Sequence, residues 1–240
     1  MSEITTSSDK SGGVLEDSLE VLWAPATVFQ RSATRGVGMY MLVLTAFLII
    51  VMLATKGLLQ PYMDANYDLQ MIKMAEQGKP VPTEGLETIR SISSWTLLIG
   101  WSLTAVFSGI AGGIITWLAA KLVRTPLAFG RAVFIATLAS VPRVIGFLSM
   151  AVQGALVNPD TITSPFSASL GPARFLDART ANSAVLAILG GIDLFTAWNI
   201  VITAIGVSVI AKTSRSSGWI VSVIAWALSV ILTLLPVLLT

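Results

Sequence analysis

The sequence contains no cysteine and no histidine among its 240 residues, and only 12% of the residues are charged. The lack of cysteine excludes disulfide bonds and thiolate metal sites, and the lack of histidine removes the usual metal ligand and the usual general base near neutral pH. We therefore predict no catalytic residue, no metal site, no cofactor and no enzyme activity. The net charge of +2 is too small to suggest nucleic acid as a partner.

Soluble domains carry about 25% charged residues, so the low charge and the 54% hydrophobic content indicate an integral membrane protein. Five apolar segments are long enough to cross a hydrocarbon core of roughly 30 Å. They predict an all-α fold, a polytopic membrane helix bundle with five transmembrane helices at residues 36–55, 95–120, 127–157, 184–211 and 218–240. One five-span domain thus covers residues 36–240.

Three polar segments lie outside these spans. Residues 1–13 are rich in Ser, Thr and Gly and are expected to be disordered. Residues 56–93 and 158–182 are expected to form external segments, and the first of them contains two expected short helices, near 65–76 and 83–92.

Residues 14–35 predict an amphipathic segment next to the first span. Its apolar side chains recur at helical spacing, at Leu15, Leu19, Leu22 and Trp23. Its acidic side chains fall on the opposite side, at Glu16, Asp17 and Glu20. A helix lying on the membrane surface fits this pattern, and a cap packed on the other helices fits it equally well.

Positive charge is concentrated in alternate connections between the spans. The cations are Arg31 and Arg35, then Lys121, Arg124 and Arg131, and finally Lys212 and Arg215. Because cytoplasmic loops carry an excess of Lys and Arg, this pattern predicts a cytoplasmic N-terminus and an external C-terminus.

Two opposite charges stand inside apolar segments: Arg143 in the third predicted span and Asp193 in the fourth. A carboxylate inside the membrane costs about 2.5–3.5 kcal/mol on insertion scales, so it should face protein or water and have a partner. We predict an intramembrane pair between Arg143 and Asp193, with Thr196, Asn199 and Thr203 on the same polar face as Asp193. The pair could serve as a staple between helices or could line a route for an ion or solute.

The spans also contain candidate packing and bending positions. Gly109 and Gly113 form one GxxxG motif, which lets helix backbones approach closely in lipid. We expect this seam to pack within the bundle, and homo-oligomerisation is left open. Pro142 lies near the middle of the third span and predicts a hinge, because proline removes one backbone hydrogen bond.

Three short motifs occur in a recognisable order. They are Trp23-Ala-Pro25 with Phe29, Ala139-Ser-Val-Pro142, and Asp193-Leu-Phe195-Thr-Ala-Trp198 followed by Gly206. Together with five spans, this order resembles the Yip-one domain family (the Ypt/Rab-interacting protein type), in its bacterial form, from about residue 14 to the C-terminus. The resemblance implies a multi-pass protein of the bacterial cytoplasmic (inner) membrane with no established enzyme activity. The Rab-type GTPase partner of eukaryotic relatives is not carried over.

Two functions follow from these patterns. The first is a non-enzymatic membrane scaffold that organises lipid or a membrane or cytoplasmic protein partner. The alternative is a small-solute or ion permease with a polar path around Asp193 and Arg143. A scaffold needs a dry, packed interior, whereas a permease needs a polar cavity that water can enter.

Overall fold

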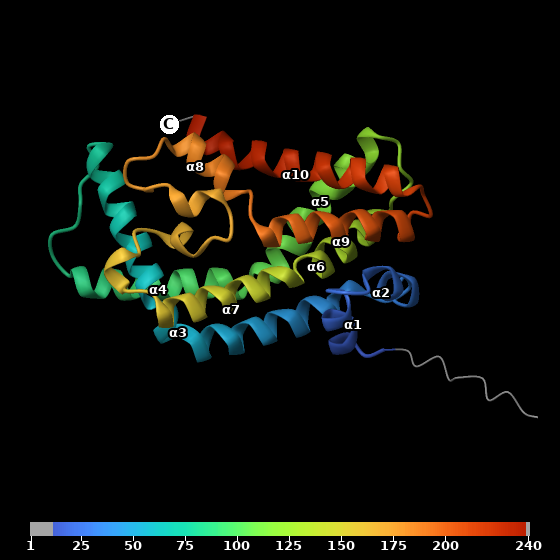
Figure 1. The fold of residues 1–240 in the computed structure, drawn as a ribbon, viewed down its shortest axis with the longest axis horizontal. Helices are drawn as coiled ribbons and strands as arrows, with labels where there is room; N and C mark the ends of the chain where they lie inside the picture. The colour runs from blue at the N-terminus through green and yellow to red at the C-terminus, as the bar shows by residue number, and fades with distance from the viewer. Residues whose placement is uncertain (1–11, 239–240) are drawn as a thin grey trace, which may run out of the picture.

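The computed structural model describes residues 12–238, and within them the chain consists of helices and connections only. The helices are α1 (Val14–Glu20), α2 (Pro25–Arg31), α3 (Val37–Glu76), α4 (Leu86–Ser102), α5 (Thr104–Leu122), α6 (Phe129–Ala139), α7 (Val141–Leu156), α8 (Ser183–Gly190), α9 (Leu194–Ile210) and α10 (Arg215–Leu238) (Figure 1). Three short 3-10 turns lie between α7 and α8: η1 (Pro159–Thr161), η2 (Pro165–Ala168) and η3 (Pro172–Phe175). The disorder expected for residues 1–13 falls almost entirely outside the described residues.

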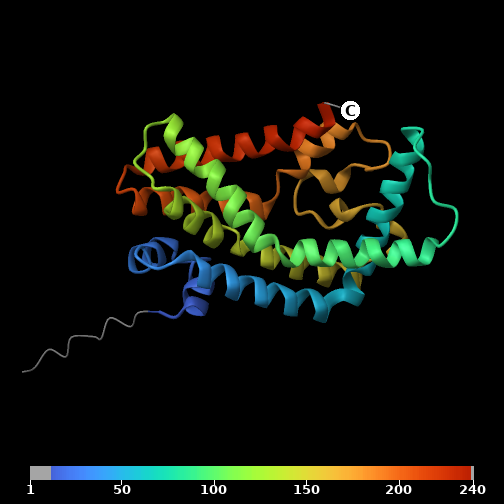
Figure 2. The ribbon, with the colours of Figure 1, turned by 180° about the vertical axis from the view of Figure 1, so that it is seen from behind.

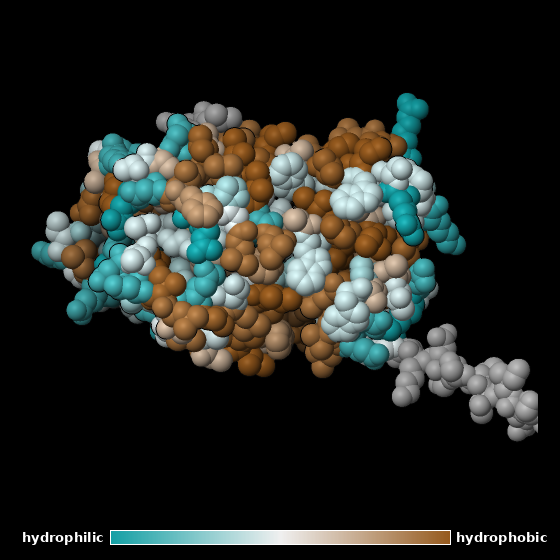
Figure 3. All heavy atoms as spheres, viewed as in Figure 1, coloured by the Kyte–Doolittle hydropathy of each residue, from teal (hydrophilic) through white to brown (hydrophobic). Residues whose placement is uncertain are grey.

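The predicted membrane helix bundle is confirmed. In the part of the chain that the structure describes, four stretches are long and apolar enough to cross a membrane: Val37–Glu76, Thr104–Leu122, Phe129–Leu156 and Arg215–Leu235. The helices α8 and α9 make a fifth if they are counted as one bent span. The face shown in Figure 3 agrees with this arrangement, because hydrophobic residues cover most of its middle and hydrophilic residues gather toward its two ends.

The cation-bearing connections lie at one end of the bundle. Figure 1 places the α1–α2 arm, the α5–α6 connection and the α9–α10 connection together, with the α3–α4 turn at the opposite end. The connections rich in Lys and Arg, from which the orientation is predicted, therefore lie at the same end of the bundle. Which face is cytoplasmic stays a prediction.

Helix α3 is longer than the first predicted span. It runs for 40 residues, and its second half turns steeply away from its first half (Figures 1 and 2). The helix expected near 65–76 is the end of α3 rather than a separate element, and α3 contains Pro61, a residue type that commonly kinks helices. Helix α3 packs against α4, and Arg90 of α4 donates a 2.7 Å hydrogen bond to Asp68 in the second half of α3, although the two helices run in different directions there (Figure 1).

The second and third predicted spans are each interrupted. Helix α4 ends at Ser102 and α5 begins at Thr104, and Figure 2 shows α5 leaving α4 at an angle. Helix α6 ends at Ala139, and α7 has Pro142 in its first turn. The interruption thus falls where Pro142 predicted a hinge, since proline has no N–H to continue the hydrogen bonding.

The glycine seam of α5 lies inside the bundle. A Cβ atom at Gly113 would come within 2.6 Å of the Val133 backbone on α6, and one at Gly109 would clash with Thr137 of α6 and Met41 of α3. These glycines allow α5 and α6 to pack closely, which they could not do with larger residues.

Candidate functional site

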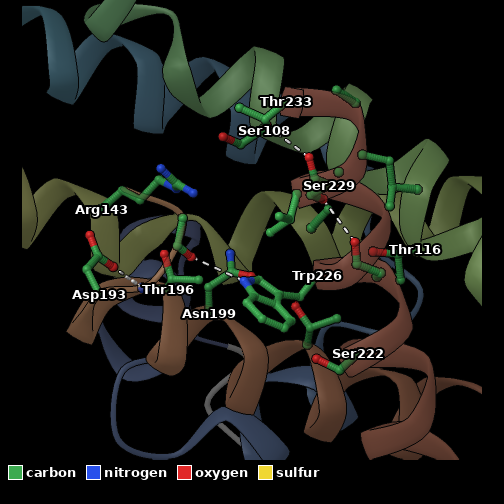
Figure 4. Close-up of a pocket in the computed structure, with 18 of the residues that line it drawn as sticks. Ser108, Thr116, Arg143, Asp193, Thr196, Asn199, Ser222, Trp226, Ser229 and Thr233 are labelled. Atoms are coloured by element: carbon green, nitrogen blue, oxygen red, sulfur yellow. Dashed lines mark hydrogen bonds between the residues drawn. The ribbon is translucent and has the colours of Figure 1, made fainter. Parts of the chain in front are cut away.

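A cavity of about 550 Å³ lies within the bundle between α5, α7, α8, α9 and α10 (Figure 4). Its polar lining comes mainly from serine, threonine and two charged side chains. These residues are Ser108, Thr116, Arg143, Asp193, Thr196, Asn199, Thr203, Ser222, Trp226, Ser229 and Thr233. The two charges predicted from the sequence therefore face one space.

Asp193 lies at a break in the fourth predicted span. Helices α8 and α9 are bent by 53° relative to each other, so the fourth predicted span, over 184–211, is broken at this point. Asp193 is the N-cap of α9, and its Oδ1 accepts a hydrogen bond of 2.6 Å from the backbone N–H of Thr196. The first N–H groups of a helix lack partners within the helix. The Asp193 carboxylate satisfies one of these N–H groups at the start of α9.

Arg143 lies in the first turn of α7, and its side chain is exposed to the cavity. Among the described residues, no side chain or carbonyl accepts a hydrogen bond from its guanidinium. The predicted ion pair is not formed, because no charged atoms of Arg143 and Asp193 lie within 4.0 Å of each other. Asp193 caps α9 through Oδ1, and the guanidinium of Arg143 points away from Asp193, so the two side chains share a cavity without forming a bond (Figure 4).

The predicted polar face of α9 divides into two roles. Thr196 and Thr203 line the cavity. Asn199 also donates a 2.7 Å hydrogen bond from Nδ2 to the carbonyl of Ala139, at the end of α6. The backbone N–H of Arg143 bonds to the Ser140 carbonyl instead, so Asn199 satisfies a carbonyl that the interruption between α6 and α7 leaves free.

The last helix supplies polar groups that the sequence reading did not single out. Ser222, Ser229 and Thr233 line the cavity, and the indole N–H of Trp226 donates a 3.2 Å hydrogen bond to the Gly191 carbonyl at the α8–α9 break. These positions recur every three or four residues, the spacing of one helical face. That recurrence within an apolar span is the signal that could have revealed them.

A second cavity of about 240 Å³ adjoins the first. Both cavities are lined by Arg143, Asp193, Phe166 and Gly190, so the two charges stand where the cavities meet. The remaining lining of the smaller cavity is mainly apolar and aromatic: Trp101, Gly146, Phe147, Met150, Pro165, Ala168, Ser169, Leu170 and Phe195. The junction is therefore polar on one side and apolar on the other.

A separate charged cluster holds the N-terminal arm to the bundle. Asp17 is completely buried, which corrects its placement on the polar side of the amphipathic segment. Its carboxylate is contacted by Arg31 Nη2 at 2.6 Å, Arg35 Nη1 at 2.7 Å and Ser32 Oγ at 2.5 Å, and it accepts a hydrogen bond from the hydroxyl of Tyr40. Four donors therefore converge on one carboxylate.

Burial is the largest influence on the pKa of Asp17 and would raise it. The hydrogen bonds from Ser32, Tyr40 and Arg31, with the positive charge of Arg31, outweigh burial and hold the pKa below its ordinary value. Asp17 is thus ionised at neutral pH, and the cluster connects α1 and α2 to the start of α3.

The residues that carry the Yip-one resemblance lie mostly where the arm meets the bundle. Phe29 is buried, its ring lies 6.1 Å from that of Phe134 in an edge-to-face arrangement, and a Cβ atom at Gly206 would come within 2.8 Å of it. The indole N–H of Trp198 donates a 3.2 Å hydrogen bond to the Leu22 carbonyl. These contacts dock the arm onto α6 and α9.

Three further motif positions have other surroundings. Pro25 is the first residue of α2, where its missing N–H costs nothing. Phe195 is nearly buried and lines the smaller cavity. Trp23 is 70% exposed.

Within residues 12–238, no group of three or more acidic side chains is placed to hold a metal ion. No protein-family model matches the chain, and no solved structure matches it. The chain is similar to a protein described as "Membrane protein YknW" of Bacillus subtilis (strain 168), with 22% identity over 214 residues, which cover 89% of this chain and 87% of that protein. The apolar helices and this similarity indicate a multi-pass integral membrane protein, and the Yip-one resemblance stays a prediction.

Proposed function

We propose that the chain is a non-enzymatic protein of the bacterial cytoplasmic membrane that binds a small polar solute within its helix bundle and carries it across. The observation that supports this function is the cavity of about 550 Å³, which contains two charged side chains that are not paired with each other. Sites for small molecules are typically clefts or cavities of about 300–1,000 Å³ with a few convergent polar groups. A dry, packed interior would have favoured the scaffold instead.

The charges strengthen the case for a wet interior. An ionised side chain inside a membrane is expensive unless it faces protein, water or a ligand. Arg143 makes no hydrogen bond to the described residues through its guanidinium, so water or a solute is its remaining partner. The broken helix at Asp193 agrees with this function, because discontinuous helices commonly form solute sites in membrane transporters.

Solute flux tests the proposal. Purified protein is placed in liposomes, the liposomes are shrunk in glycine, L-leucine, glycine betaine or xylitol, and their recovery is followed by stopped-flow light scattering. We expect recovery faster than in empty liposomes with at least one solute, and its loss in Arg143→Gln and Asp193→Asn. Arg174→Gln, at an exposed position that lines neither cavity, is the matched control. Recovery equal to that of empty liposomes with all four solutes would refute transport.

A scaffold is the second candidate, favoured by the surface of the N-terminal arm. Leu15, Leu19 and Trp23 are 63%, 57% and 70% exposed on it, while the Asp17 cluster and Phe29 hold the arm against the bundle. Such an apolar surface fits the headgroup region of a bilayer or a protein partner. Replacing the three exposed residues with serine, followed by mild co-purification and mass spectrometry, tests this function. A stoichiometric partner lost in the variant supports the scaffold, and purification without any partner contradicts it.

A further inference from the structure

The two cavities together define the charges that a bound solute would meet. Arg143 and Asp193 are the only charged side chains among the described residues that line either cavity. The lining therefore carries one positive and one negative charge. Because the two groups are not within 4.0 Å of each other, neither neutralises the other through a direct contact.

Each charge has unused hydrogen-bonding capacity. The guanidinium of Arg143 presents a planar fork of donors, which matches a carboxylate. Asp193 uses Oδ1 to cap α9, and its Oδ2 accepts no hydrogen bond from the described residues. A cationic ammonium group is the complement of that oxygen.

One positive and one negative side chain in the same lining discriminate among solutes by their charge. A simple anion attracted by Arg143 is repelled by Asp193, and a simple cation meets the reverse arrangement. A neutral solute leaves both charges without a partner, which is costly inside a membrane. A zwitterion offers a carboxylate to Arg143 and an ammonium group to Asp193 at the same time.

The smaller cavity adds a preference for a side chain. It begins at the two charges and is lined by apolar and aromatic groups that include Trp101, Phe147 and Met150. A solute whose charged groups sit at the junction would place an attached apolar group in this space, where burial removes that group from water. Its volume of about 240 Å³ leaves room for a branched aliphatic chain.

We infer that the site binds an α-amino-acid-like zwitterion with an apolar side chain, with the carboxylate on Arg143, the ammonium group on Asp193 and the side chain in the smaller cavity. This inference rests on the proposed function, since it names the solute of the same site.

Calorimetry of the full-length protein in lipid nanodiscs tests the solute class. The probes are L-leucine, N-acetyl-L-leucine (which lacks the positive charge), L-leucinamide (which lacks the negative charge) and glycine (which lacks the side chain). We expect L-leucine to bind and each of the other three to bind about tenfold more weakly, or worse, because each loses one of the three interactions.

The variants assign each charge to its residue. Arg143→Gln should make L-leucine and L-leucinamide bind equally, and Asp193→Asn should do the same for L-leucine and N-acetyl-L-leucine. Asparagine also caps helices well, so the second variant removes the charge and keeps α9 capped. Arg143→Lys should retain part of the affinity, which separates lost charge from lost folding, and Arg174→Gln should bind as the unmodified protein does.

The outcomes separate this inference from the proposed function. If leucinamide or N-acetyl-leucine binds as tightly as leucine, or if no probe binds, the zwitterion is the wrong class, whatever the flux assay shows. If glycine binds as tightly as leucine, the assignment of the smaller cavity is wrong. Leucine binding without flux would uphold the ligand and refute transport.

Discussion

The buried Asp17 makes the sharpest prediction about how the N-terminal arm is held. The substitution Asp17→Asn keeps the shape of the side chain and removes its charge. Arg35 then loses its ion pair with Asp17, Arg31 keeps only its 2.6 Å ion pair with Glu20, and Ser32 and Tyr40 share one remaining acceptor. We expect the arm to detach from the bundle more often.

The expected size follows from the burial of the partners. Removing one partner of a fully buried ion pair costs about 3–5 kcal/mol. The side chains of Arg31 and Arg35 are 22% and 28% exposed, so water can solvate them once the carboxylate is lost. We therefore expect a smaller loss of about 2–3 kcal/mol for arm docking, which corresponds to about a thirty- to two-hundredfold increase in the detached population.

The effect should depend on pH in one direction. The pKa of Asp17 is lowered in the folded protein, so its contribution to stability is complete above its unfolded pKa of about 3.9. The contribution is lost as the pH falls through the folded pKa, which lies below that value. Docking in the unmodified protein should therefore weaken in acid below about pH 4, whereas docking in Asp17→Asn should not change there.

Limited trypsin digestion measures the detached population, because cleavage after Arg31 or Arg35 requires the arm to open. Initial cleavage rates at neutral pH should rise by the factor given above in Asp17→Asn. Glu16→Gln is the matched control, because Glu16 is exposed on the same helix and its change should alter stability by about 0.5 kcal/mol or less. Equal cleavage rates in Asp17→Asn and Glu16→Gln would refute the reasoning.

Two further predictions concern helix packing. Gly113→Ala should lower the thermal unfolding temperature in detergent, at a cost of about 1–3 kcal/mol, because its Cβ would overlap the Val133 backbone. Gly100→Ala is the control, because a Cβ there has open space around it and should leave the unfolding temperature unchanged. Equal shifts in the two variants would contradict the α5–α6 contact. Asn199→Leu should cost about 1–3 kcal/mol because the Ala139 carbonyl loses its donor, and an unchanged unfolding temperature would show that this bond has no structural role.

Hydrophobic length was enough to find the membrane helices. A span needs about 20 apolar residues, and each of the five predicted segments contains a helix of this kind or part of one. The break before Pro142 was also predictable, because the missing N–H is a property of one residue. The break at Leu103 has no such signal, since neither proline nor glycine stands there.

The role of Asp193 was harder to read. Because it lies inside an apolar stretch, Asp193 was predicted to pair with a cation, whereas it caps helix α9, which begins there. An aspartate before an apolar run is also an N-cap signal, and Gly190 and Gly191 mark the end of α8. Neither the N-cap signal nor the two glycines stood out, because the whole stretch is strongly apolar. The polar residues on one face of α10 were missed for the same reason.

Asp17 could not be placed from its own helix. The apolar spacing of α1 puts it with the solvent-facing acids, and its burial depends on four donors 14 to 23 residues further along the chain. Such long-range pairing is absent from local periodicity. Likewise, the sequence could place Arg143 and Asp193 in one region but could not show that they line a common cavity without forming an ion pair.

The central claim is that water reaches this cavity from outside the membrane, and thiol labelling tests it most directly. The chain has no cysteine, so Thr196→Cys and Val201→Cys each introduce one thiol on α9, the first in the cavity and the second on the exposed side outside it. Only a hydrated thiol forms the reactive thiolate, so a membrane-impermeant thiosulfonate should label Thr196→Cys about tenfold faster or more in intact proteoliposomes. Equally slow labelling of both thiols would contradict the account.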